Sequence, residues 1–230
     1  GDRITHADGK VLDGLKQAQV SEQLRGPIHS EITLQIERKG ENAPLIVKLD
    51  RAHIVPDTVS YGHKNGIVYL KISTFNQRTA RNLLNKLKKA RTNLGDDIKG
   101  IVLDMRGNPG GLLKQSIQVA DLFLAQGRIS ETRGRHPDSL QSYDAGGRDM
   151  AYGRPVVVLV DGKSASAAEV AAAALQDRGR AVVIGTSSFG KGTVQTVIRL
   201  PNEGEITLTW SRLIAPSGFV LHGLGVYPTI

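Results

Sequence analysis

From residue 60 onward, short apolar runs alternate with longer amphipathic stretches, and this alternation limits the possible folds more than any other feature of the chain. The runs 67–72 and 100–105 have the length and the branched apolar composition of strands. The stretches 79–93 and 112–125 that follow them repeat apolar residues at helical spacing. Because strands that alternate with helices build layered folds, we expect an α/β core over residues 60–230.

The pattern continues in the second half of this core. We expect further strands at 155–160, 181–184 and 194–200, and a helix at 167–176. The segment 133–153 is polar, rich in glycine and without clear periodicity, so it is predicted to be a surface loop. We find no internal repeat.

Residues 1–52 are predicted to form a separate and smaller unit. Apolar residues alternate with polar ones over 32–36 and 45–49, which is the period of a half-buried strand, and a helical stretch at 14–24 precedes them. Strands and a helix of this length suggest a small α+β module. Residues 53–59, which include a proline, are predicted to be a linker.

Composition excludes several classes of protein. With 40% hydrophobic and 23% charged residues, the 230-residue chain is typical of a globular protein, and no apolar run approaches the length of a membrane span. The absence of cysteine excludes disulfides, thiolate catalysis and cysteine-ligated zinc. The six histidines are isolated from one another and show no metal-ligand spacing. We therefore expect neither a metal nor a cofactor.

The formal net charge of +8 would suit a nucleic-acid partner, but the distribution of the charge does not favour one. Lysines and arginines are spread along the chain, and their main cluster, at 86–91, has the spacing of a solvated helix face. Aromatic residues that could stack on bases make up only 4%. We expect a dispersed basic surface and no nucleic-acid partner.

Ser166 and Lys191 are the residues that suggest chemistry. Ser166 opens an alanine-rich helix, and Lys191 follows a phenylalanine and a glycine in a later loop. A serine hydroxyl is a weak nucleophile and needs a general base, and a lysine serves as that base only when its amine is neutral. Burial in an apolar pocket favours the neutral amine, so we expect Lys191 to be buried beside Ser166.

Ser166 also has a purely structural interpretation, because Ser166 and Glu169 have the spacing of a capping box at a helix start. The two roles are compatible. The first turn of a helix has unpaired backbone N–H groups, and these can stabilise an oxyanion next to the serine. The amide of Ala167 is the candidate donor.

Glycines in two loops offer further candidate groups. Gly110 and Gly111 end a turn after an expected strand, where they would either aim an amide into a site or simply complete the turn. The segment 185–193 imitates a phosphate-binding loop, but glycine stands where the hydroxyl is required and a strand follows instead of a helix. We therefore do not expect nucleotide binding. Gln195 shares a strand face with Lys191 and could orient its amine.

Three separated motifs together closely resemble those of the C-terminal processing peptidases, or tail-specific proteases, a serine protease family of bacteria and chloroplasts. They are Leu-Asp-Met-Arg-Gly-Asn-Pro-Gly-Gly at 103–111, Ser-Ala-Ser-Ala-Ala-Glu at 164–169 and Phe-Gly-Lys-Gly-Thr-Val-Gln at 189–195. The resemblance implies a nucleophile Ser166, a general base Lys191, a lysine-orienting Gln195, and an oxyanion hole from Ala167 with Gly110 or Gly111. An aspartate implicated in some members falls on Asp177, which we expect to be structural.

The resemblance also carries expectations for the whole chain. It implies a layered protease core similar to the ClpP and crotonase-type fold, preceded over 1–52 by the latter part of a PDZ domain whose carboxylate-binding loop would lie before Gly1. Substrates would be proteins with accessible, unstructured and apolar C-terminal tails, and an adaptor or self-association is a further expectation. The implied location is the bacterial periplasm or cell envelope.

Three function classes remain open on sequence grounds. The leading one is an endopeptidase that forms an acyl-enzyme on Ser166. The second is a non-catalytic binding scaffold or a protease core in a resting state, since a misaligned Ser166 and Lys191 cannot be recognised in sequence. The third is an acyl-CoA enzyme of the crotonase type, which the layered fold alone would permit.

Overall fold

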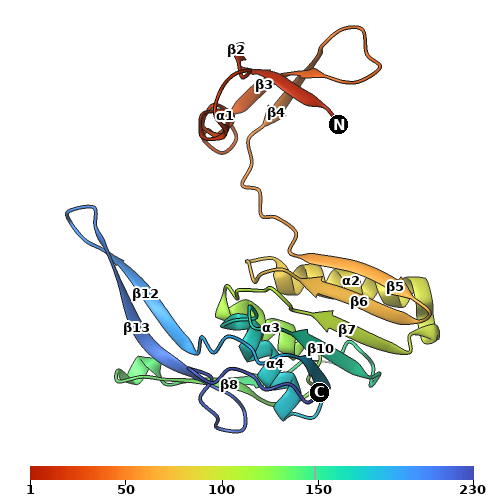
Figure 1. The fold of residues 1–230 in the computed structure, drawn as a ribbon, viewed down its shortest axis with the longest axis vertical. Coiled ribbons are helices and arrows are strands. Elements are labelled where there is room, and N and C mark those ends of the chain that lie inside the picture. The colour runs from red at the N-terminus through yellow and green to blue at the C-terminus, as the bar shows by residue number, and fades with distance from the viewer. Residues whose placement is uncertain (148) are drawn as a thin grey trace. The chain divides into compact units, whose positions relative to one another are not determined.

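A computed structural model describes residues 1–147 and 149–230, and these fall into two units, Gly1–Ile54 and Val55–Ile230. The boundary lies within the predicted linker 53–59. Figure 1 shows both units, and each is described by itself below.

The first unit is a four-stranded antiparallel sheet with one helix. Its elements are β1 (Arg3–Ala7), β2 (Lys10–Val11), α1 (Gln17–Leu24), β3 (Glu31–Glu37) and β4 (Leu45–Asp50), with the sheet order β2-β1-β3-β4. The core is small: its buried apolar residues are Ala7, Leu12, Ile32 and Leu34, and α1 packs on them through Val20 and Leu24. The alternation over 32–36 thus reflects a strand with one buried face, as predicted.

The second unit is built around a five-stranded sheet, and it confirms the predicted mixed α/β core. The strands are β5 (Val59–Lys64), β6 (Ile67–Ile72), β7 (Gly100–Asp104), β10 (Val156–Val160) and β11 (Ala181–Gly185), in the order β11-β10-β7-β6-β5. All neighbours are parallel except β5 and β6, which pair antiparallel. The carboxyl ends of β7 and β10 therefore meet at the same edge of the sheet. The turn with Gly110 and Gly111 follows β7, and the turn with Ser166 follows β10.

Three helices complete the core: α2 (Thr79–Leu94), α3 (Leu113–Asp121) and α4 (Ala167–Asp177), with the short 3-10 turns Gly95–Asp97 and Pro137–Ser139 between elements. In α2, Leu83, Leu87 and Ala90 are buried, while Lys88 and Lys89 are exposed. Lys86 is half-buried and pairs with Asp57 at 3.1 Å. The basic cluster is thus a solvated helix face, as expected. Helix α4 is buried over Ala167–Leu175, and its alanines let it fit between neighbouring elements.

A second, antiparallel sheet was only partly foreseen. It consists of β8 (Gly127–Arg133), β9 (Gln141–Ala145), β12 (Thr193–Arg199) and β13 (Glu205–Ile214), in the order β12-β13-β8-β9. The prediction of a surface loop over 133–153 was wrong for β9, whose polar residues pair with β8. Residue 148, in the same predicted loop, lies outside the described residues.

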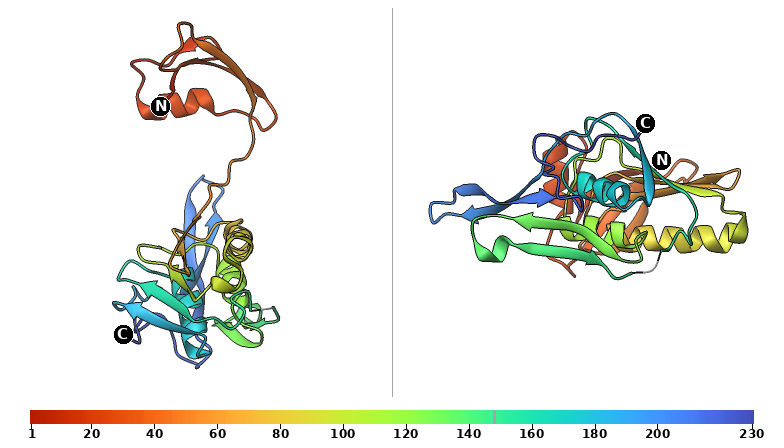
Figure 2. Two further views of the ribbon diagram at one scale, coloured as in Figure 1. Left: turned by 90° about the vertical axis from the view of Figure 1, so that its right-hand side faces the viewer. Right: turned by 90° about the horizontal axis from the view of Figure 1, so that it is seen from below.

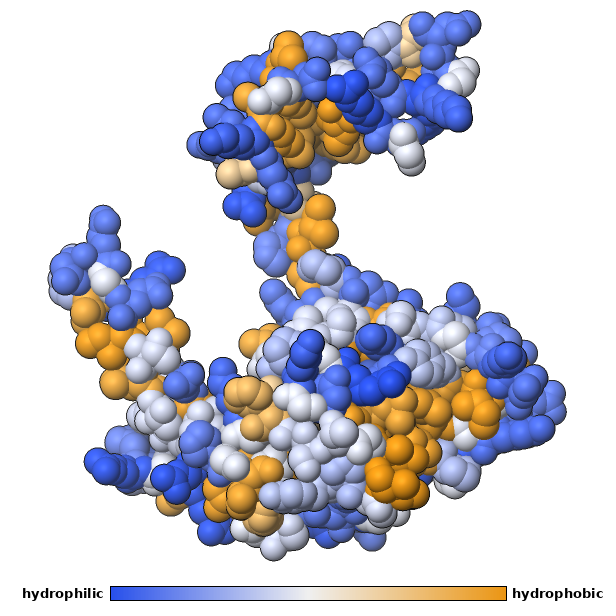
Figure 3. Space-filling view, in the orientation of Figure 1, coloured by the Kyte–Doolittle hydropathy of each residue, from blue (hydrophilic) through white to orange (hydrophobic). Residues whose placement is uncertain are grey.

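The strands β12 and β13 form a long hairpin that projects beyond the body of the second unit (Figure 2). Figure 3 shows that apolar residues cover part of it. Its exposed large apolar residues are Val197, Ile198, Ile206, Leu208 and Trp210. By contrast Leu213, near the end of β13, is buried in the main core. None of the helices in the described chain is long and apolar enough to cross a membrane.

Candidate active site

Ser166 occupies a sharp turn between the end of β10 and the start of α4. Its backbone has φ 54° and ψ −113°, a conformation that residues with a Cβ rarely adopt. The preceding residue is held in place because the Ala165 N–H donates to the carbonyl of Asn108 at 2.9 Å. The turn therefore presents a half-buried serine at the N-terminus of a buried helix.

The carboxylate of Glu169 joins the loop of Ser166 to the loop of Lys191. It forms the predicted capping box with Ser166, whose N–H donates to Oε2 at 2.6 Å. The same Oε2 accepts the Lys191 N–H at 2.8 Å, and Oε1 accepts the Gly190 N–H at 2.6 Å and the Ser188 hydroxyl at 2.5 Å. Glu169 is only 1% exposed. The sequence indicated the capping box, but nothing in it pointed to the bonds with residues 188–191.

Most of the residues nominated from sequence line one cavity of about 360 Å³. Its lining residues are Gly111, Leu112, Leu113, Ser166, Ala167, Lys191, Thr193, Val194, Gln195 and Leu213. The candidate nucleophile, base, lysine-orienting glutamine and two candidate oxyanion donors are thus brought together from segments that are far apart in sequence. Gly110 lies directly behind the serine but is not part of the lining.

The environment of Lys191 differs from the expectation. Burial in an apolar pocket was expected, whereas Lys191 is exposed and so is Gln195. Within residues 1–147 and 149–230, neither side chain hydrogen-bonds to Ser166 or to the other. The physical reason is position: the cavity is open, and Lys191 lies in the loop just before the hairpin that projects from the core.

The two glycines of the turn after β7 have different roles. A Cβ at Gly110, where φ is +101°, would lie 2.7 Å from the Ala165 carbonyl oxygen and 2.9 Å from Ser166 Cβ, so only glycine allows this approach. The Gly110 N–H donates to Asn108 Oδ1 at 2.9 Å and is already engaged. Gly111 N–H finds no acceptor among the described residues. Of the two alternatives left by the sequence, Gly111 is therefore the available donor.

A charged cluster anchors the start of this turn. Asp104, at the end of β7, is fully buried and accepts hydrogen bonds from the Arg106 guanidinium at 2.9 and 2.8 Å and from the Tyr69 hydroxyl. Burial raises the pKa of Asp104, but the hydrogen bonds from Arg106 and Tyr69 outweigh it and lower the pKa from 3.8 to about 2. The carboxylate therefore stays ionised and fixes the turn at physiological pH.

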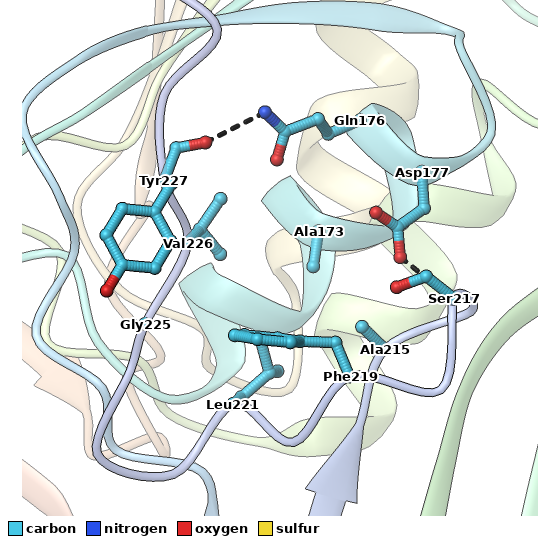
Figure 4. A pocket seen from close by; sticks show the side chains of 10 residues that line it. All are labelled: Ala173, Gln176, Asp177, Ala215, Ser217, Phe219, Leu221, Gly225, Val226 and Tyr227. Carbon is cyan, nitrogen blue, oxygen red and sulfur yellow. Dashed lines mark hydrogen bonds between the residues drawn. The ribbon is translucent and has the colours of Figure 1, made fainter.

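Asp177 lies at the other end of α4, away from Ser166. Figure 4 shows it beside a separate, mostly apolar pocket of about 210 Å³, with its Oδ2 accepting the Ser217 N–H at 3.0 Å. Neighbouring Gln176 donates from Nε2 to the Tyr227 carbonyl at 2.9 Å. Both side chains tie α4 to the C-terminal segment. In the part of the chain that the structure describes, no three acidic or histidine side chains gather as metal ligands would.

Comparison with known proteins identifies the family of this arrangement. The model of the family described as Peptidase family S41 matches residues 66–230. The carboxy-terminal-processing protease of Bartonella bacilliformis is 42% identical over 231 residues, which cover 100% of this chain and 53% of that protein. A probable CtpA-like serine protease of Staphylococcus aureus is 31% identical and is matched over 45% of its length. The chain thus spans about half the length of these relatives.

Solved structures agree with this match. The photosystem II D1 C-terminal processing protease superposes with a TM-score of 0.68 at 27% identity, covering 100% of this chain and 62% of that one. A putative S41 protease from Bacteroides fragilis has a TM-score of 0.60 at 19% identity over 100% of this chain and 65% of its own, and so supports the fold alone. On the family match and the 42% identical relative, the chain belongs to peptidase family S41.

Proposed function

We propose that this chain is the catalytic part of a serine endopeptidase that cleaves proteins from or near an unstructured, apolar C-terminal tail. The observation that carries the proposal is the cavity of about 360 Å³ shared by Ser166, Lys191 and Gln195 with the backbone of Gly111 and Ala167. A nucleophile, a basic amine and unpaired amides around one opening are the parts that acyl transfer requires.

In the proposed reaction Ser166 Oγ attacks the carbonyl carbon of the scissile peptide, and its proton passes to the neutral amine of Lys191. The amides of Gly111 and Ala167 stabilise the oxyanion that forms. Lys191 then gives the proton to the leaving amine, and water hydrolyses the acyl-enzyme by the same steps in reverse order. A substrate lying over the open cavity would exclude water from Lys191, which favours the neutral amine that the reaction needs. Gln195 orients that amine.

The relatives of this chain extend the proposal to the substrate and to the location in the cell. Two of them are named as C-terminal processing proteases, so we assign a protein tail as the substrate. We propose that the first unit is the latter part of a PDZ domain, a kind of domain that binds protein tails by strand addition. The layered core is proposed to be of the ClpP and crotonase type. A bacterial cell envelope or periplasm is the proposed location, with an adaptor or a second copy as partner.

One observation favours a second candidate, a resting protease core. Lys191 is exposed, and in the described residues it makes no hydrogen bond with Ser166. The two candidates are separated by labelling with a serine-directed phosphonate, followed by mass spectrometry, because only an aligned serine and base react at Ser166. Labelling that Lys191→Ala abolishes supports an active site, whereas an unlabelled chain supports the resting core.

The proposed activity itself is tested with a loosely folded protein that ends in an apolar tail. We expect cleavage by the chain as it stands and none by Ser166→Ala or Lys191→Ala, with both variants keeping the circular dichroism spectrum of the parent. Products identified by mass spectrometry would give the cleavage position. Cleavage retained in either variant contradicts the proposed roles.

A further inference from the structure

The peptide unit between Gly110 and Gly111 is held firmly on one side. Its carbonyl oxygen, on Gly110, accepts two hydrogen bonds, one from the Thr74 hydroxyl at 2.7 Å and one from the Phe75 N–H at 2.9 Å. Phe75 is buried, and its carbonyl in turn accepts the Leu112 N–H at 2.8 Å. Two donors from the segment after β6 therefore fix the direction of this carbonyl.

The carbonyl direction decides where the N–H of the same peptide points. A peptide bond is planar and, when trans, directs its C=O and N–H to opposite sides. With the Gly110 oxygen turned toward Thr74 and Phe75, the Gly111 N–H is turned away from them. Gly111 lines the cavity of Ser166, and its N–H has no acceptor in the described chain. The N–H is therefore free for a ligand in that cavity.

We infer that Thr74 is a positioning residue for the oxyanion hole. Its hydroxyl holds the Gly110–Gly111 peptide in the orientation that offers the Gly111 N–H to the oxyanion, next to the Ala167 N–H. This inference rests on the proposed function, because it assigns Thr74 a role in acyl transfer at Ser166. Thr74 itself does not line the cavity and acts only through this peptide.

The opposite side of the turn supports the assignment. Asn108 is fully buried, accepts the Gly110 N–H on Oδ1 at 2.9 Å and donates from Nδ2 to the Ile72 carbonyl at 2.9 Å. Asn108 thus removes the Gly110 amide from the set of donors and fixes the turn from behind. With the Gly110 amide occupied, the oxyanion hole depends on the Gly111 amide and on the hydrogen bonds that keep the Gly110–Gly111 peptide from rotating.

A rotated peptide would reverse the effect of the site on the oxyanion. The Gly110 carbonyl would then face the cavity and oppose negative charge, instead of an N–H that stabilises it. Gly110 has φ +101° and Gly111 has φ +137°, so both positions have the freedom that only glycine allows. The orientation must therefore come from the hydrogen bonds, and Thr74 supplies the side-chain one.

The test compares Thr74→Val with Thr74→Ser in the full chain. Valine keeps the branched shape and removes the hydroxyl, while serine keeps the hydroxyl. Because loss of one oxyanion donor costs about a hundredfold to a thousandfold and the Phe75 N–H remains, we expect kcat to fall about tenfold to a hundredfold in Thr74→Val with KM unchanged. Thr74→Ser should restore most of kcat. A peptide aldehyde, whose adduct carries the oxyanion, should lose affinity in parallel, while a cleaved product peptide should bind as before.

The controls separate this inference from the proposed function. If Ser166→Ala still cleaves, the proposed function fails and the role of Thr74 fails with it. If cleavage needs Ser166 but Thr74→Val turns over at the parent rate, or if KM rises while kcat is unchanged, only the inference is overturned. Crystals of Thr74→Val give an activity-independent readout. A Gly110–Gly111 peptide in its present orientation, seen together with full aldehyde affinity, would overturn the inference as well.

Discussion

The backbone of Ser166 is strained, and the strain can be measured. At φ 54° and ψ −113° a Cβ is disfavoured, and a conformation of this kind costs about 1–3 kcal/mol. Glycine removes that cost but adds about 0.5–1 kcal/mol of chain entropy to the unfolded state. We therefore expect Ser166→Gly to be about 1 kcal/mol more stable than Ser166→Ala in guanidinium unfolding. Since neither variant keeps the proposed nucleophile, self-cleavage cannot distort the comparison. A Ser166→Gly variant that is less stable than Ser166→Ala by about 0.5–1 kcal/mol would show that the turn carries no strain.

Glu169 is the residue whose replacement should have the widest effect. In Glu169→Gln one oxygen becomes an NH₂ group, which cannot accept an N–H. Depending on which oxygen is replaced, either the Ser166 and Lys191 N–H groups or the Gly190 N–H lose their acceptor. Hydrogen bonds to a buried charge contribute about 1.5–3 kcal/mol each. We expect a loss of roughly 2–4 kcal/mol in the free energy of unfolding, together with loss of phosphonate labelling at Ser166 under conditions where the variant is folded.

Replacement of an exposed carboxylate provides the matched control for Glu169. Glu205, at the start of β13, pairs only loosely with Arg199 at 3.6 Å on the surface. Glu205→Gln should leave both stability and labelling within error of the parent. If Glu169→Gln behaved like Glu205→Gln, the loop connection assigned to Glu169 would be wrong.

Asp104 should make stability depend on acid pH. Its pKa is about 2 in the folded protein, below the ordinary aspartate value of 3.8 that applies to the unfolded chain, so the stabilisation is present above about pH 4 and is lost as the pH falls toward 2. The contribution is on the order of 1 to 2 kcal/mol. Urea unfolding of the parent and of Asp104→Asn between pH 6 and pH 3 should give curves that converge as the pH falls. A constant gap between them would exclude this role for Asp104.

At the scale of residues, the sequence predicted which residues belong to the candidate site but not how their side chains and amides are oriented. Ser166, Lys191 and Gln195 were found because a weak nucleophile needs a base and a base needs a partner, and the three line one cavity. Their catalytic roles stay predictions. The choice of Gly111 over Gly110 depends on a hydrogen bond to Asn108, and the exposure of Lys191 depends on the position of a hairpin. No local pattern encodes either.

At the scale of elements, prediction succeeded where periodicity was strong. The strand Ile67–Ile72 and the helix starting at Thr79 agree with the expected bounds because their apolar residues repeat cleanly. Helix α3 ends at Asp121, earlier than the expected 125. The strands Val59–Lys64 and Gln141–Ala145 were missed because they are short and polar and are stabilised by pairing with a neighbour, which sequence alone does not display.

The β12–β13 hairpin should tolerate polar residues where it is exposed. Ile206 and Leu208 are 41% and 51% exposed, so the double change to threonine keeps strand propensity and should alter the free energy of unfolding by less than about 0.5 kcal/mol. Leu213 of the same strand is 2% exposed, and Leu213→Ala should cost about 2–5 kcal/mol. Guanidinium unfolding measures both. A large loss in the double variant would mean that the hairpin residues are covered in solution.

At the scale of the whole molecule, the two units should be separable. The first unit has only four buried apolar residues in its core, whereas the second holds the large core together with every residue of the candidate site. We expect residues 55–230 expressed alone to show the main unfolding transition of the full chain, followed by circular dichroism, with the same midpoint. They should also be labelled by phosphonate to the same extent as the full chain. Loss of labelling with the fold intact would show that the first unit takes part in forming the site.

The Glu169 carboxylate, which joins the loop of Ser166 to the loop of Lys191, has a consequence for inhibition. A molecule that drew residues 188–191 outward would break their bonds to the carboxylate that also accepts the Ser166 N–H, so the proposed nucleophile would be disturbed without being touched. Resistance to such a molecule could not arise at the serine itself. Activity would then switch in one step, because the proposed nucleophile and the proposed base would lose their positions together.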